Sequence, residues 1–495
     1  MKFPTSLHST RSIFWPIFGK EHFKFLPLAF MMFFILLDYS LMRSVKDALV
    51  VTEVGPEAIG FIKTYFVFPS AILMTALYYK LCNIMDPKKV FYVIAGMFLL
   101  YFTVFSTVVF PNMPQMLLSQ DWADSLTASS PRLKWFVRIF QYWPHTTFYI
   151  ASELWGSTMI SLFFWQLANQ ITNPSEAKRH YAMFGLLGNL GLIATSTLIE
   201  QTMQPTNRRY DIVFGILIVS IAAIVSLYYF LQNYVATRAD LIEGVIETKK
   251  KKKAKPSIAQ SIQVIFSSPY LGLLALLLIA YGVSNILVET IWKQRVGQLH
   301  PDPAAYLLFM GQYQKYLGVT TMFFTLVGSN ILRFVTWTQA AIITPLMFTI
   351  TAGLFFLFIL GSQGGDAALL SSVMNLSDAL FLSVIIGGSQ NVLSKATKYS
   401  LFDSTQKMAY MPLNEELKTK GMSAVEVIGG RFGKMGGGII TSTLLTIFPM
   451  ATLLDLTPAL ALFCAVIVVI WVLSVFSLGK KYHAEMDARL AESNA

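Results

Sequence analysis

The sequence predicts an all-α polytopic membrane protein with twelve transmembrane helices arranged as two bundles of six. Three observations predict this class. Of the 495 residues, 55% are hydrophobic and only 13% are charged, whereas soluble domains carry about 25% charged residues. The mean hydropathy is +0.56. Twelve apolar runs approach the ~20 residues that a helix needs to cross a bilayer. This composition excludes a water-soluble enzyme.

The twelve runs fall into two sets of six. The first set lies near residues 26–45, 59–80, 90–110, 147–168, 182–200 and 212–232, and the second near 270–290, 305–331, 338–360, 372–394, 424–448 and 456–478. The fourth, fifth, eighth, tenth and eleventh runs are the weakest, because they contain Gly, Asn, Gln, Ser or charged residues. Polar residues within membrane helices usually face a bundle interior or a watery cavity.

Basic residues give the orientation and the domain boundaries. The formal net charge is +11, and six lysines lie at 249–255. Cytoplasmic loops carry an excess of Lys and Arg, so both termini are expected in the cytoplasm and the connection 111–146 outside. We expect an N-terminal bundle at 1–235, a basic linker at 236–268 and a C-terminal bundle at 269–495. The basic run could bind nucleic acid or anionic lipid, but a solvated linker is favoured. This layout is that of major-facilitator-type transporters.

Charged residues at the end of the first span and in the fourth span are candidate site residues, because a charge at the bilayer centre costs about 2.5–3.5 kcal/mol on insertion scales. Arg43, Lys46 and Asp47 share one face near the end of the first span. The alternative for this group is a local Arg43–Asp47 ion pair at a helix end. Glu153 begins a polar stripe that recurs every four residues in the fourth span.

The second half supplies the other candidates. Asn285 and Glu289 are four residues apart and share a face of the seventh span. The alternative for Glu289 is an interfacial pair with Lys293, also four residues away. In the tenth span, Asn391 and Lys395 belong to one helical stripe, which begins at Gly387 and ends at Lys398.

Lys434 in the eleventh span lies between glycines spaced by four, at 430 and 438. These glycines indicate either close helix packing or the approach of a large ligand beside Lys434. The segment is not a phosphate-binding P-loop, because Ile428 and Met435 occupy positions that require Gly and Ser or Thr. The histidines and the two cysteines form no metal-ligand spacing, so we expect no metal and no cofactor. Internal cations with few carboxylates suit a multiply charged anion, which predicts an organic-anion transporter.

Ordered segments between residue 24 and about residue 440 carry a resemblance to a known family. They read KFLPLAF, MRSVKDALVVT, FIKTY, SELWG, FFWQLANQIT, AKRHYAMFGLLGNLG, AYGV with LVE and WK, KYSLFD with KMAYMPL, and GRFGKMGG. The chain resembles the nonmitochondrial ATP/ADP translocases, the nucleotide transport proteins of plastids and obligate intracellular bacteria. It resembles the bacterial members more, because the first span begins near residue 26 and leaves little room for a plastid transit peptide.

The resemblance implies import of ATP in exchange for ADP, with phosphate as a further substrate. It implies that four charged residues carry transport, and these match Lys46, Glu153, Glu289 and Lys434. We expect a functional monomer in the lipid bilayer of a bacterial inner membrane, without a nucleic-acid polymer as partner. From the residues, Arg43, Lys46, Lys395 and Lys434 are expected to attract phosphate groups.

Two positions depart from the family pattern. The family often has Asn three residues before the glutamate of LVE, whereas Asn285 is four residues before Glu289. Met435 replaces a common serine after the lysine of the eleventh span. A nucleotide importer of broader specificity, driven by protons through Glu153 or Glu289, therefore remains an alternative. A membrane enzyme acting on phosphorylated lipid would need a metal or nucleophile that the sequence lacks. A receptor or scaffold gives no reason for charges in four spans.

Overall fold

The computed structural model describes residues 17–238, 241, 263, 265–266, 268–363, 376–413 and 415–494. Within these ranges the protein is almost entirely helical, and its one sheet is the small antiparallel pair β1 (Met203–Gln204) and β2 (Asn207–Arg208). The lysine run at 249–255 and most of the predicted linker lie outside the described residues. The domain boundaries at 235 and 269 therefore remain predictions.

The first half of the chain forms six long helical segments and a cluster of short helices. The long segments are α2 (His22–Leu49) with the π-helical η2 (Val50–Val54); α3 (Ala58–Phe61), η3 (Ile62–Val67) and α4 (Phe68–Ile84); α5 (Pro87–Val104) with η4 (Phe105–Val109); α9 (Trp143–Thr158), η6 (Met159–Phe164) and α10 (Trp165–Ile171); α11 (Pro174–Thr202); and α12 (Tyr210–Phe230) with η7 (Leu231–Val235). The short elements are η1 (Gly19–Glu21), α6 (Met113–Met116), α7 (Gln120–Ser129), η5 (Pro131–Leu133) and α8 (Lys134–Gln141).

The second half forms six more long helices. These are α14 (Pro269–Leu299), α15 (Pro303–Phe334), α16 (Trp337–Gln363), α18 (Leu376–Thr397) with η8 (Lys398–Phe402), α20 (Glu415–Ile447) and α21 (Thr457–Asn494); the short α19 (Asp403–Met408) follows η8. Each of the twelve predicted spans coincides with one long segment. Several helices begin at a proline after a capping residue: Asn173 caps α11, Ser268 caps α14 and Asp302 caps α15.

Eight helices of the described residues are long and apolar enough to cross a membrane. The four predicted spans below that threshold lie at 147–168, 305–331, 372–394 and 424–448. All four were among the five weakest in the sequence, whereas the fifth weak span, at 182–200, meets the threshold. Polar and small side chains lower the hydropathy of these four helices. Some of these side chains, such as Asn391 and Lys395, are buried in the protein, whereas others, such as Ser157, are exposed.

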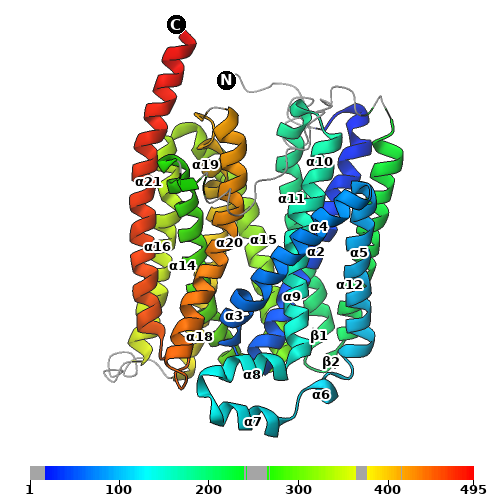
Figure 1. Cartoon of the computed structure of the whole chain (residues 1–495), viewed down its shortest axis with the longest axis vertical. Helices are drawn as coiled ribbons and strands as arrows, with labels where there is room; N and C mark the ends of the chain where they lie inside the picture. The colour runs from blue at the N-terminus through cyan, green and yellow to red at the C-terminus, as the bar shows by residue number, and fades with distance from the viewer. Residues whose placement is uncertain are drawn as a thin grey trace.

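The two halves lie side by side, with α2–α12 on the right of Figure 1 and α14–α21 on the left. The long α21 ends at the top of the view, and the short helices α6, α7 and α8 lie at the bottom. Segment 111–146, the predicted external connection, therefore lies at the end opposite to the end of α21. In the middle, α15 packs along α11 and α2, so helices of the two halves are in direct contact.

Glycines allow close helix contacts at the seam between the halves. A Cβ atom at Gly438 of α20 would lie 3.0 Å from the carbonyl oxygen of Gly60 in α3. A Cβ atom at Gly311 of α15 would lie 3.0 Å from the side chain of Ile199 in α11. Any larger side chain at these positions would push the halves apart.

Candidate functional site

The C-terminal part of α2 carries a buried lysine, Lys46, whose ion pairs join two helices of the first half. The Lys46 Nζ atom lies 3.0 Å from Asp47 Oδ1 and 3.1 Å from Glu153 Oε1 of α9. The Lys46 ammonium also lies 3.7 Å from the centroid of the Tyr149 ring. Because α2 continues to Leu49 and then into η2, these charges lie inside a long helix and not at its end.

The local Arg43–Asp47 pair considered from the sequence is not found among the ion pairs of the described residues. Asp47 instead binds Lys46 and, through its second oxygen at 2.8 Å, Lys293 of α14. The Arg43 guanidinium binds Glu289 at 2.8 Å. Both Arg43 and Asp47 therefore bind residues of the second half, which sequence spacing alone could not reveal.

Glu289 of α14 is the most heavily bonded carboxylate of this region. Its Oε1 atom lies 2.8 Å from Arg43 Nη2 and 3.0 Å from Lys293 Nζ. Its Oε2 atom accepts a hydrogen bond of 3.1 Å from the Asn285 amide and lies 3.4 Å from Lys395 Nζ of α18. The alternative of a Glu289–Lys293 pair is confirmed as a contact, and both side chains of the pair are buried in the protein.

We call the connected residues the central charge cluster; they are Arg43, Lys46, Asp47, Glu153, Glu289, Lys293 and Lys395. Two of its contacts, Arg43–Glu289 and Asp47–Lys293, join the halves. Every side chain of the cluster is at most 15% exposed. Removing one partner from such a buried pair is strongly destabilising, because the remaining charge is left unpaired away from water.

Lys395 and Asn391 differ in their surroundings, although they share a helical stripe. Lys395 donates a hydrogen bond of 3.0 Å to the Tyr313 hydroxyl of α15, in addition to its contact with Glu289. Asn391 is fully buried, and its amide donates a hydrogen bond of 3.0 Å to the carbonyl oxygen of Gly387 in its own helix. No hydrogen bond or ion pair of the described residues joins Asn391 to the cluster, so its role in binding stays a prediction.

Two further lysines face the cluster from either side of the seam. Lys434 of α20 is exposed, yet it lies within electrostatic range of Glu153 and Arg43. Lys63 of η3 is half-buried and lies within electrostatic range of Glu289 and Glu153. Neither lysine forms an ion pair with a carboxylate in the described part of the chain. Both can therefore bind an anion without first losing a partner.

The charges of this region do not balance. Within the described residues, the cluster contains four cations and three carboxylates. Lys63 and Lys434 add two more positive charges. Arg forms bidentate contacts with phosphate, and Lys binds it as a point charge. The excess of positive charge, at the boundary between two halves, suits a ligand that carries several negative charges.

The glycines around Lys434 have two functions. Gly433 packs against α14 so closely that a Cβ atom on it would lie 3.0 Å from the carbonyl oxygen of Leu278. Gly438 packs on Gly60 and Thr64 of the first half. Gly430, one turn before Lys434, has open space where a Cβ atom would be. Helix packing therefore explains most of these glycines, and only Gly430 leaves room beside Lys434.

Sequence reasoning missed part of the site. Lys293 and Asp47 were considered only as local partners, and Lys63 was noted only within the motif FIKTY. The signal that could have found Lys63 is its place in a predicted span, at 59–80. The aromatic neighbours Tyr149 and Tyr313 carried no signal, because tyrosine is common at membrane interfaces.

A buried carboxylate also lies at the seam outside the spans. Glu57, just before α3, is 6% exposed and accepts a hydrogen bond from the backbone of Leu453 in the second half. Burial raises the pKa of the Glu57 carboxyl above its ordinary value, although this hydrogen bond opposes the shift. The two halves are thus also in polar contact just before α3, a helix that packs against α8 near the bottom of Figure 1.

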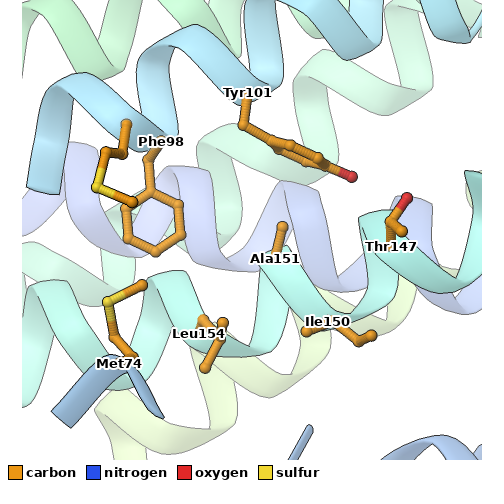
Figure 2. A pocket seen from close by; sticks show the side chains of 8 residues that line it. Met74, Phe98, Tyr101, Thr147, Ile150, Ala151 and Leu154 are labelled. Carbon is orange, nitrogen blue, oxygen red and sulfur yellow. The ribbon is translucent and has the colours of Figure 1, made fainter. Parts of the chain in front are cut away.

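An apolar cavity of about 250 Å³ lies elsewhere, between α4, α5 and α9. Figure 2 shows the carbon and sulfur atoms of Met74, Phe98, Ile150 and Leu154 around it, with hydroxyl groups only on Tyr101 and Thr147. Its lining contains no charged residue. This cavity does not suit a charged substrate, in contrast to the central charge cluster.

Comparisons with known proteins identify a family that the chain matches over nearly its whole length. Residues 2–482 match the family model described as TLC ATP/ADP transporter. The chain is 47% identical over 478 residues to ADP,ATP carrier protein 1 of Rickettsia bellii, covering 95% of this chain and 96% of that protein. It is 38% identical to ADP,ATP carrier protein 3 of Rickettsia typhi, covering 95% of this chain and 97% of that protein.

Solved structures support the fold. A POT family transporter in complex with 5-aminolevulinic acid aligns with a TM-score of 0.56 at 11% identity, covering 93% of this chain and 96% of that chain. The inward-open xylose transporter XylE from E. coli aligns with a TM-score of 0.54 at 10% identity, covering 92% and 94%. The predicted all-α polytopic class with a major-facilitator-like architecture is confirmed.

The Glu289→Gln substitution is expected to destabilise the substrate-free protein by about 3 kcal/mol or more, because it leaves buried cations without their shared carboxylate. The readout is the thermal unfolding midpoint of the purified protein in detergent. The matched control is Asp403→Asn, which breaks the half-buried Lys398–Asp403 pair and should cost less than about 1 kcal/mol. Equal unfolding midpoints for the two variants would contradict the expectation that Glu289 stabilises the substrate-free protein more than Asp403 does.

Proposed function

The chain belongs to the TLC ATP/ADP transporter family, and from this membership we propose that the central charge cluster, with Lys63 and Lys434, binds the phosphate groups of the transported nucleotides. The protein is a multi-pass membrane transporter that exchanges ATP and ADP, and it is not an enzyme. The observation that supports the site is the excess of positive charge at the boundary of the two halves.

We propose the following direction and setting. ATP enters in exchange for ADP, with phosphate accompanying ADP. A monomer carries out the exchange in a bacterial inner membrane, and both termini lie in the cytoplasm. ATP and ADP differ by about one charge, so exchange of these two nucleotides alone would be electrogenic and would sense about 2.3 kcal/mol per 100 mV of membrane potential. Phosphate that leaves with ADP carries negative charge and offsets this difference.

The ion pairs explain why the two halves do not reorient when no substrate is bound. Without substrate, Glu289 and Asp47 neutralise cations of both halves and hold the halves together. A nucleotide replaces these carboxylates, because its phosphate oxygens offer the same kind of acceptor to Arg43, Lys46 and Lys395. The halves can then reorient around a loaded site, as in alternating access.

Asn285 supports recognition of the base. Its amide nitrogen is bound to Glu289, whereas its Oδ1 atom has no hydrogen-bond partner among the described residues. An exocyclic amino group, such as that of adenine, can donate to this oxygen. The changed spacing between Asn285 and Glu289 keeps both on one face of α14.

The alternative function, proton-driven import of several nucleotides, required Glu153 or Glu289 to carry a proton. Glu153 lies 3.1 Å from the Lys46 ammonium, and Glu289 contacts three cations. Both carboxylates therefore already have the charged partners that an ionised group needs. The geometry favours exchange over this alternative.

Lys46→Ala and Lys434→Ala are each expected to abolish exchange, because each removes a cation from the phosphate site. Lys434→Ala should leave the amount of folded protein unchanged, whereas Lys46→Ala should also lower the unfolding midpoint, because it removes the buried partner of Glu153. The assay is uptake of labelled ATP into proteoliposomes loaded with ADP; liposomes without ADP inside should show almost no uptake with the parent protein. The matched control is Lys398→Ala, which removes a lysine of the same region that is paired with Asp403. Normal ATP uptake by the Lys434→Ala variant would contradict the proposed phosphate site. ATP uptake into liposomes without internal ADP would argue against exchange.

Lys63→Ala is expected to weaken apparent affinity for ATP and ADP by about 10- to 100-fold, the value of one lost charge-assisted hydrogen bond. Lys63→Arg should retain most of the affinity, since it keeps the charge. The apparent KM in the same assay separates these outcomes, and an unchanged KM for Lys63→Ala would exclude contact with phosphate.

Asn285→Ala is expected to change the preference between adenine and guanine nucleotides more than the ratio of ATP to ADP. Competition by unlabelled ATP, ADP, GTP and GDP against labelled ATP measures both ratios. An equal loss for all four nucleotides would count against recognition of the base by Asn285.

A further inference from the structure

Asp38 is a buried acid that the nucleotide site does not use. It lies in the middle of α2, five residues before Arg43, and its side chain is fully buried. It faces α12, which packs along α2 within the first half of the chain. A carboxyl group at this depth costs several kcal/mol unless it is paired or neutral.

The hydrogen bonds around Asp38 involve one hydroxyl group. Asp38 Oδ1 is in hydrogen-bond contact with Ser220 Oγ of α12. The same Ser220 Oγ lies 3.1 Å from the carbonyl oxygen of Leu217, one turn earlier in α12. Asp38 Oδ2 has no hydrogen-bond partner among the described residues.

The contacts of Ser220 Oγ with Asp38 Oδ1 and with Leu217 O can both be hydrogen bonds if the Asp38 carboxyl group carries a proton. A serine hydroxyl has one proton to donate, and two oxygens, Asp38 Oδ1 and Leu217 O, compete for it. A carbonyl oxygen has no proton of its own. If the Asp38 carboxyl is protonated, it donates to Ser220 Oγ and Ser220 donates to Leu217, so that both contacts are satisfied.

An ionised Asp38 would be unusual in this protein. Three other buried carboxylates of the described helices, Asp47, Glu176 and Glu289, each lie 2.6–3.0 Å from at least one lysine. Glu57, just before α3, is the other buried carboxylate of the described residues without an ion pair. Asp38 has no Lys, Arg or His in an ion pair within the described part of the chain. As an anion it would hold a single hydrogen bond and leave Oδ2 unpaired, which is far more costly than a neutral acid.

We propose that Asp38 is a proton-binding site, separate from the nucleotide site, whose neutral carboxyl group joins α2 to α12. Through this bond it positions α2, the helix that also presents Arg43, Lys46 and Asp47. Both α2 and α12 belong to the first half, so rocking of one half against the other leaves the bond intact. The proton therefore stays bound during exchange and is not a transported ion; this last step rests on the proposed function.

The direct test is infrared spectroscopy of the purified protein at neutral pH. The carbonyl stretch of a protonated carboxyl group should be present in the parent and lost in Asp38→Asn. It should shift in Ser220→Ala, which removes the hydrogen-bond acceptor. The matched control Asp403→Asn, at an ion-paired acid, should leave the band unchanged. If Asp38→Asn removes no such band, the proposal is overturned; this measurement needs no nucleotide and is independent of the proposed function.

Transport measurements test the positioning role. Asn is neutral and can donate to Ser220, so Asp38→Asn should exchange ATP for ADP within about threefold of the parent, because the hydrogen bond is kept. Asp38→Ala should lower exchange and the unfolding midpoint together. A pH-sensitive dye inside the liposomes should report the same proton movement, or the same lack of it, for the parent protein and for Asp38→Asn. Loss of exchange in folded Asp38→Asn, or a sodium-dependent midpoint that this variant removes, would show that the ionised form is the one required.

Discussion

The rest of the site depends on the ion pairs of the Glu289 carboxylate. It contacts one cation from the first half, Arg43, and two from the second half, Lys293 and Lys395. Each cation would be costly if left alone in the protein interior. One acidic side chain thus makes it possible for three basic side chains to converge at the seam, and it does so through contacts that phosphate oxygens can replace.

Glycine packing fixes where this carboxylate lies. Gly282 and Gly433 bring α14 and α20 so close that a Cβ atom on Gly282 would lie 2.7 Å from the Cα atom of Gly433. A lysine on α20 and an acid on α14 are thereby held at a constant separation. On the other side, π-helical segments follow Asp47 and Glu153 in their spans, and η3 contains Lys63. Such widened turns are frequent at functional sites, because they rotate the following residues.

The sequence was sufficient to predict the class, the twelve helices and four charged residues of the candidate site. Lys46, Glu153, Glu289 and Lys434 could be found because charge is costly in an apolar span, and each of the four has a counterpart in the family motifs. The partners could not be predicted. Asp47 is four residues from Arg43, yet it binds Lys293, which is distant in sequence, because helix crossing and not helix spacing decides that contact. Asp38 escaped notice since one carboxyl in a strongly apolar run gives no pattern.

The balance of charge also explains why the proposed site favours exchange of nucleotides over one-way transport. Without a nucleotide, the described site has more cations than carboxylates, and the inter-half pairs Arg43–Glu289 and Asp47–Lys293 help to limit the resulting repulsion. Reorientation must loosen these pairs while the excess charge is still unscreened. A bound nucleotide supplies the missing negative charge before the pairs loosen, so the barrier falls only for a loaded site. An acid that remained ionised in the middle of α2 would add a competing anion a few residues from Arg43, and a protonated Asp38 avoids this competition.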